Sequence, residues 1–167
     1  DVSKTKLSDR MSADLALVRC DIYGIGAKAS TDPITRNDLF EQAITAYDEY
    51  LQANPYAENR AEAEESLIDL SSVYARSIDI SLEDAVGEEA TELRDRKVSV
   101  LEKAITRCES LVEEIESIDP QTPATQTRRN VLMLQKASLY GKISASTPDD
   151  AFFSEQRSEE RRVGGEG

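Results

Sequence analysis

Residues 40–55 read FEQAITAYDEYLQANP, and residues 101–106 repeat the start of this stretch as LEKAIT. The two copies share Glu, Ala, Ile and Thr at the same relative positions. Apolar residues in the longer stretch recur every three or four positions, the spacing of one face of an α-helix. The stretch ends at Asn54–Pro55, and a residue before proline is driven out of the helical region. The repeat therefore predicts two helices in equivalent places of one fold.

A second marker alternates with the first along the chain. This marker has five positions: a small residue, a polar residue, an aliphatic residue (Ile, Val or Leu), a tyrosine, and finally Gly or Ala. It reads CDIYG at 20–24, SSVYA at 71–75 and ASLYG at 137–141. A small residue lets two helices approach closely, and the tyrosine one turn later fills the gap beside the crossing. One helical hairpin cannot bury its apolar face alone, so hairpins of this kind stack. The alternation predicts stacked antiparallel helical hairpins.

Start and stop signals predict an all-α chain of about five helices plus the beginning of a sixth. The first helix carries an apolar face at Leu7, Met11, Leu15, Val18, Ile22 and Ile25, and Gly24, Gly26 and the loop before Pro33 should end it. We expect Asn37 to cap the second helix and a Ser81/Asp84 capping box to open a long fourth helix through Ile118. Thr122–Pro123 should open the fifth helix, and 151–153 should begin the sixth. No segment alternates as a strand does.

These helices divide the chain into units at about 3–56, 57–119 and 122–156, the last incomplete. The array resembles the tetratricopeptide repeat family. Ala43, Tyr47, Tyr50 and Pro55 match the family's Ala, aromatic, Ala and Pro positions with Tyr50 in place of Ala, and Leu67, Leu70, Ser71 and Tyr74 match its large, Leu, small and aromatic positions. The markers are 51, 66 and 61 residues apart, whereas the family repeats at about 34. The resemblance covers 7–156 as architecture and is specific within 40–75. It implies a short α-solenoid of bacterial origin, with a generic hairpin array or long-helix bundle as the alternative.

Composition excludes several classes of function. The 167 residues carry a net charge of −13, and such a surface repels nucleic-acid phosphates and anionic lipid. No run approaches the roughly 18 apolar residues that a membrane span needs. There is no histidine, and histidine is the commonest general base and metal ligand. Cys20 and Cys108 fall at small-residue interface positions and are interpreted as buried structural thiols.

Two segments resemble ligand-binding loops but lack residues that such loops need. GIGAKAS at 24–30 follows a helix and lacks the Lys-Ser/Thr ending of a phosphate-binding loop. DISLEDAVGEEA at 79–90 has Asp84 where a calcium loop needs glycine and Ala90 where it needs a bidentate glutamate. We therefore expect no catalytic, cofactor-binding or metal-binding residues and no enzymatic activity.

A binding groove remains as the candidate site. In arrays of the resembled family, side chains of the first helix of each hairpin line a concave face. By that resemblance Asp21, Ser72, Arg76, Ser138 and Lys142 would offer hydrogen bonds to an extended or helical peptide. The leading interpretation is a non-enzymatic protein-interaction scaffold within a longer protein. The alternatives are a subunit that self-associates through the heptad-like spacing of 82–118, and an accessory domain of an enzyme. The compartment stays open between bacterial cytoplasm and cell envelope.

The last residues, RSEERRVGGEG at 157–167, balance three Arg against three Glu. Their apolar content cannot offset the entropy of ordering, so we expect disorder. RSEERRVG also resembles the translation of a common sequencing adapter, although the final GEG departs from it. We therefore expect that 157–167 is not native and that the natural chain continues past Gln156.

Overall fold

The computed structural model describes residues 2–118 and 121–145, with side chains described from Met11 onward except for residue 12. The expected sixth helix and the 157–167 tail lie outside these ranges. Five helices make up the described part: α1 (Val2–Ala29), α2 (Pro33–Ala53), α3 (Arg60–Leu82), α4 (Gly87–Glu116) and α5 (Pro123–Ser144). No strand occurs among the described residues. The expected all-α class with its helical hairpins is confirmed.

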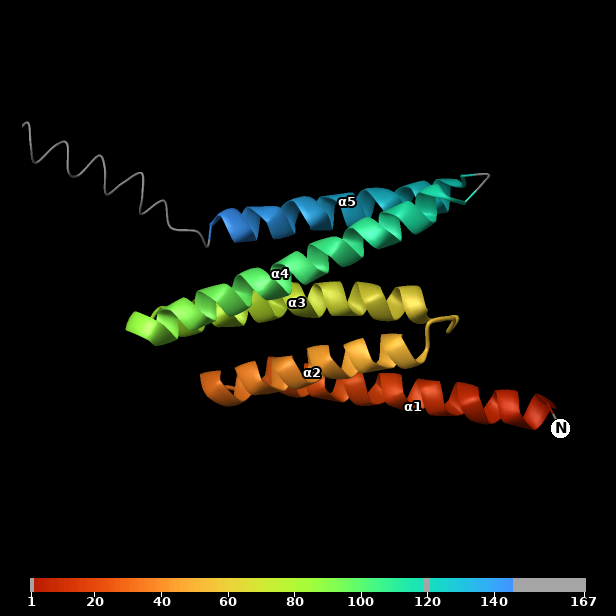
Figure 1. The fold of residues 1–167 in the computed structure, drawn as a ribbon, viewed down its shortest axis with the longest axis horizontal. Coiled ribbons are helices and arrows are strands. Elements are labelled where there is room, and N and C mark those ends of the chain that lie inside the picture. Colours follow the sequence, from red (N-terminus) through yellow and green to blue (C-terminus); the bar gives the residue numbers. More distant parts are fainter. Residues whose placement is uncertain (1, 119–120, 146–167) are drawn as a thin grey trace, which may run out of the picture.

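Successive helices run back and forth and stack in chain order (Figure 1). Sequence neighbours contact one another along the whole array, α1 with α2, α2 with α3, α3 with α4 and α4 with α5. Ion pairs also join the even-numbered helices: Glu41 binds Arg96, and Asp48 binds Arg107. Both partner numbers rise together, so α2 and α4 run in the same direction. This is the geometry of one hairpin stacked on the next.

In the middle of the stack, the markers found in the sequence occupy the helix contacts. Ala43 and Ala104 are buried, as are Phe40 and Leu101 at the starts of the two repeated stretches. Tyr74 is fully buried, its ring stacks on Phe40 with centroids 5.3 Å apart, and its hydroxyl donates to a Glu41 carboxylate oxygen at 2.8 Å. The small-residue and tyrosine positions therefore do what the repeat predicts in the middle of the stack.

The tyrosine marker behaves differently at the two ends. Tyr23 in α1 is half-buried, and Tyr140 in α5 is 49% exposed. The local sequence is nearly the same in all three copies, so the difference comes from the neighbours. Tyr74 has a helical hairpin on each side, whereas α1 and α5 each have one neighbouring helix in strong contact.

The structure differs from the expected helix boundaries at three places. α1 does end at the loop before Pro33, but Gly24 and Gly26 do not stop it: the helix continues to Ala29, because glycine lowers helix stability by only about 1 kcal/mol and packing can offset this. Asp32, and not Asn37, caps α2: its carboxylate accepts from the Thr35 N–H at 2.8 Å, with Pro33 in the first turn.

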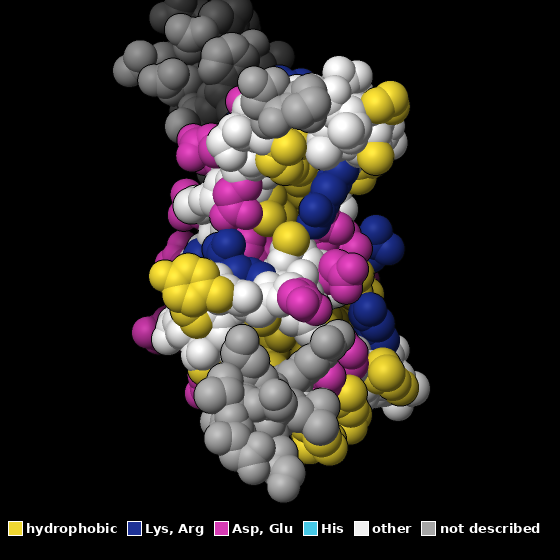
Figure 2. All heavy atoms as spheres, turned by 90° about the vertical axis from the view of Figure 1, so that its right-hand side faces the viewer, with side chains coloured by type: hydrophobic (Ala, Val, Ile, Leu, Met, Phe, Trp, Pro, Cys, Tyr) yellow, Lys and Arg dark blue, Asp and Glu magenta, His cyan; other side chains and the backbone are white. Residues whose placement is uncertain are grey.

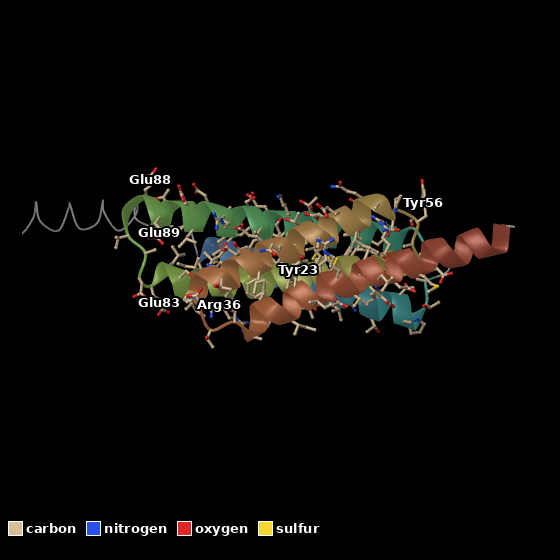
Figure 3. The ribbon with its side chains drawn as sticks, turned by 90° about the horizontal axis from the view of Figure 1, so that it is seen from below. Tyr23, Arg36, Tyr56, Glu83, Glu88 and Glu89 are labelled. Carbon is tan, nitrogen blue, oxygen red and sulfur yellow. The ribbon has the colours of Figure 1, made fainter. Side chains whose placement is uncertain are left out.

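The third difference concerns the Ser81 capping box. α3 runs on to Leu82, and α4 begins after Val86 with no side-chain cap. Gly87 allows the turn because its φ is +62°, which disfavours other residues. Glu88 and Glu89 follow in the first turn, where the helix dipole favours carboxylates, and Figure 3 shows them near Glu83 at this end of the stack. The predicted Thr122 cap of α5 is confirmed, with Thr125 completing a capping box.

The expected apolar face of the first helix is also placed differently. Its members from Met11 onward lie on the exposed side of α1, while Cys20, Gly24 and Ala27 on the opposite side are buried. Small residues face the core because α1 lies close to its neighbours: a Cβ on Gly24 would sit 3.4 Å from Leu70 Cδ1. The large apolar residues are left outside.

Candidate functional site

Polar contacts join α3 to α5 at three levels. Arg128 donates to Glu65 at 2.5 Å, Gln135 to Asp69 at 2.9 Å, and the Lys142 ammonium to the Ser72 hydroxyl at 2.6 Å. The partner numbers rise together on both helices, so α3 and α5 run in the same direction. A row of polar contacts therefore runs along the edge of the α3–α5 contact, beside the buried apolar residues of both helices.

Positive charge gathers at one end of this row of contacts. Lys97 of α4 has only 4% of its side chain exposed and pairs with Asp79 of α3 at 2.6 Å. Burial lowers the pKa of Lys142, and the charges of Arg76 and Lys97 lower it further, while Asp79 acts against them. The charges of Arg76 and Lys97 therefore both act on Lys142, beside the Lys97–Asp79 ion pair. We call Arg76, Lys97 and Lys142, with Ser72 and Asp79, the cationic cluster.

The five predicted groove residues do not form one site. Ser72, Arg76 and Lys142 come together in the cationic cluster. Asp21 lies on α1 and accepts a hydrogen bond from the Tyr47 hydroxyl of α2 at 2.5 Å. Ser138 is exposed on α5. The structure therefore brings three of the five together and places Asp21 in a contact between α1 and α2.

Sequence reasoning missed Lys97 and Asp79, which belong to the same cluster. A signal for Lys97 was present, because it lies four residues from both Leu93 and Leu101, and these are buried. A lysine at that spacing stands on the apolar face of α4 and needs a carboxylate partner, since an unpaired buried charge is costly. Nothing local could have identified Asp79, because the pairing joins two helices.

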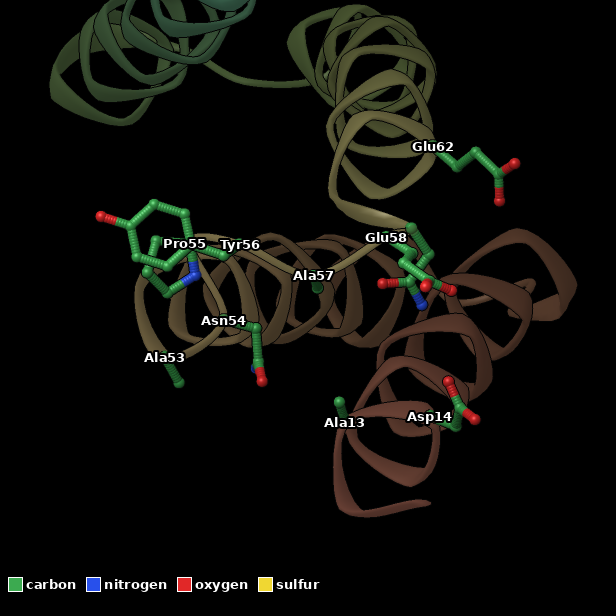
Figure 4. A pocket seen from close by; sticks show the side chains of 10 residues that line it. Ala13, Asp14, Ala53, Asn54, Pro55, Tyr56, Ala57, Glu58 and Glu62 are labelled. Atoms are coloured by element: carbon green, nitrogen blue, oxygen red, sulfur yellow. The ribbon is translucent and has the colours of Figure 1, made fainter. Parts of the chain in front are cut away.

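An open cleft of about 780 Å³ lies between α1 and the turn from α2 to α3, at the opposite end of α3 from the cationic cluster. Figure 4 shows the carboxylates of Asp14, Glu58 and Glu62 on one side of this cleft and Pro55 and Tyr56 on the other. Tyr56 is 97% exposed and points away from the helices (Figure 3). Such a lining disfavours phosphate and other anions.

The two thiols lack the surroundings that nucleophiles need. Cys20 and Cys108 are unpaired and buried, as expected. Burial raises the pKa of both, that of Cys108 to about 11, so the reactive thiolate is scarce at neutral pH. Within the described ranges, no group of three or more His, Cys, Asp or Glu residues is arranged to hold a metal ion.

The heptad-like face of α4, on which self-association through 82–118 would depend, already has partners in this chain. Leu101, Cys108 and Leu111 are fully buried against α3 and α5. Val86 and Ile118, at the two ends of that face, are exposed.

Comparison with known proteins gives no relative: no family model, no curated protein and no solved structure matches the chain. Among the described helices, none is both long enough and apolar enough to cross a membrane.

Proposed function

We propose that the chain is a non-enzymatic protein-interaction module of the tetratricopeptide type, which binds an acidic segment of a partner protein at the cationic cluster. The observation that carries the proposal is that Arg76, Lys97 and Lys142 gather around the Lys97–Asp79 ion pair. Like charges held close together repel one another. A carboxylate-bearing ligand would relieve that repulsion, and its binding would therefore be favoured.

The position of the cluster suits a peptide. Arg76 is exposed on α3, and the Ser72 hydroxyl and the Lys142 ammonium lie beside it between α3 and α5. The rest of the molecule is strongly acidic, so a basic partner would meet many competing sites, whereas an acidic segment would be directed to the cluster. The buried thiols and the lack of histidine support a binding role over a catalytic one.

Selection from a displayed peptide library tests the proposal. We expect the protein to enrich peptides that carry Asp or Glu, with affinities that fall as salt is added. The Arg76→Ala substitution should weaken the selected peptides about fivefold or more, because a charge-assisted hydrogen bond is lost. Lys103→Ala, which removes an exposed cation from α4, should leave the affinity unchanged. Failure to enrich any peptide, or equal losses in both variants, would contradict the proposal.

A further inference from the structure

The two faces of α1 differ in a way that the folded chain does not explain. Five large apolar side chains, which we call the α1 seam, have between 51% and 68% of their surface exposed: Met11, Leu15, Val18, Ile22 and Ile25. The opposite face, with Cys20, Gly24 and Ala27, is buried. Hydrophobic side chains also reach the surface at the lower right of the stack in Figure 2, on the side where α1 and α2 lie in Figure 1.

The spacing of the α1 seam fits about two heptads of a coiled coil. Its members follow one another at intervals of four, three, four and three residues, which averages 3.5 and places them at consecutive a and d positions of a heptad. Leu15 and Ile22 occupy a, and the others occupy d. In a coiled coil, two helices with this pattern bury their stripes against each other.

We propose that the α1 seam pairs with the α1 seam of a second copy of this chain, as a parallel two-helix coiled coil. The charges beside the seam select this arrangement. Asp14 lies at a g position and Arg19 at the next e position, so parallel pairing sets Asp14 against the partner's Arg19, twice by symmetry. The antiparallel alignment that pairs Leu15 with the partner's Ile25 would oppose Arg19 to the partner's Arg19.

The width of the apolar stripe limits the number of helices. Val18 and Ile25 at d would also suit a larger parallel oligomer. Asp14, Arg19 and Asp21 flank the seam, however, and leave only the narrow a/d stripe that a two-helix contact uses.

The size of the seam predicts a weak, reversible dimer. Met11 to Ile25 covers about 21 Å of helix at about 1.5 Å per residue, which is a small interface. An isolated helix of this length would be marginal in water. Packing of the inner face against α2 already orders α1, so association costs less than it would for a free peptide.

Sedimentation equilibrium of the whole chain tests the pairing at up to about 100 µM, a range suited to an interface of this size. We expect a monomer–dimer equilibrium that Leu15→Glu shifts toward monomer by at least about tenfold in the dissociation constant, with an unchanged circular dichroism spectrum because Leu15 is exposed. Leu134→Glu on the exposed face of α5 is the matched control and should leave the equilibrium unchanged. A monomer at every concentration, or a dimer that Leu134→Glu dissociates and Leu15→Glu does not, would overturn the proposal.

Cross-linking tests the orientation. In a parallel pair, a Leu15→Cys variant should form a disulfide with itself on mild oxidation, since equivalent a positions face each other. An antiparallel pair would instead require Leu15→Cys to be mixed with Ile25→Cys. Cross-linking only in the mixture would reject the parallel arrangement. The monomeric Leu15→Glu variant keeps the cationic cluster, so its peptide binding reports on the proposed function separately.

Discussion

The middle of the stack and its first helix use the same sequence pattern for different purposes. α4 and α1 both repeat apolar residues at three- and four-residue intervals, yet α4 buries Leu101, Cys108 and Leu111 inside the chain, while α1 exposes Leu15 and Ile22. α4 has α3 and α5 as strong neighbours, and α1 has α2. Periodicity thus indicates that a face will be buried, and it does not indicate whether the partner belongs to the same chain.

Truncation of one leucine in each region should give the largest contrast. Leu101→Ala removes a fully buried side chain from α4 and should lower the free energy of unfolding by about 2–5 kcal/mol. Leu15→Ala in α1 should change it by less than about 0.5 kcal/mol at a protein concentration too low for association. Urea unfolding followed by circular dichroism measures both. Similar losses in the two variants would show that Leu15 contributes as much to folding stability as Leu101, contrary to the difference between α1 and α4.

The tyrosine marker gives a smaller and more specific contrast. Tyr74→Phe removes the hydroxyl that donates to Glu41 in the buried middle of the stack, and should cost about 1–2 kcal/mol. Tyr140→Phe alters the same marker in α5, where the ring is 49% exposed, and should cost almost nothing. Equal effects in urea unfolding would mean that local sequence, and not the neighbouring hairpins, sets the environment of the tyrosine.

A buried carboxylate should produce the smallest effect, visible as a pH dependence. Burial raises the pKa of Glu64 above its ordinary value of 4.5, although Arg60 acts against the shift from 2.7 Å. The folded state therefore binds this proton more tightly than the unfolded state, and the contribution of Glu64 to stability falls as pH rises from about 4.5 through the raised pKa.

Glu64→Gln should remove that fall, so that the difference in stability from wild type changes across this interval. Glu62→Gln, on the exposed side of α3, is the control and should leave the pH profile as it is in wild type. Parallel profiles for wild type and Glu64→Gln would show that Glu64 does not titrate differently in the folded state.

The features of the fold that local chemistry dictates could be predicted from the sequence. Asn54–Pro55 and Thr122–Pro123 mark helix ends, because proline restricts its own φ and the residue before it, and the structure ends α2 and starts α5 there. Where one residue can serve two competing structures, the sequence alone does not decide between them. Ser81 can cap a helix, but α3 continues past it, and its hydroxyl accepts from the Asn37 amide instead.

The candidate site was predictable only in part, for a similar reason. Alignment of the tyrosine markers placed Ser72 and Lys142 on corresponding helices, and they do meet. Asp21 occupies the equivalent place in α1, but Tyr47 of α2 reaches it. The sequence does not show which face of α1 packs against the rest of the chain, because both faces have helical spacing. The choice depends on how closely the helices pack, and close packing favours the face with small residues.

Thiol labelling of α1 shows directly which face of this helix is exposed and whether a second copy covers it, because Val18 and Cys20 lie on opposite sides of the helix. In a Val18→Cys variant at low protein concentration, we predict that the introduced thiol reacts rapidly while Cys20 and Cys108 react only on unfolding, since both are buried and have raised pKa values. Higher protein concentration should slow the labelling at position 18. Rapid reaction of Cys20 together with a protected thiol at position 18 in the dilute protein would show that the α1 seam, and not the face with Cys20, is buried within the chain.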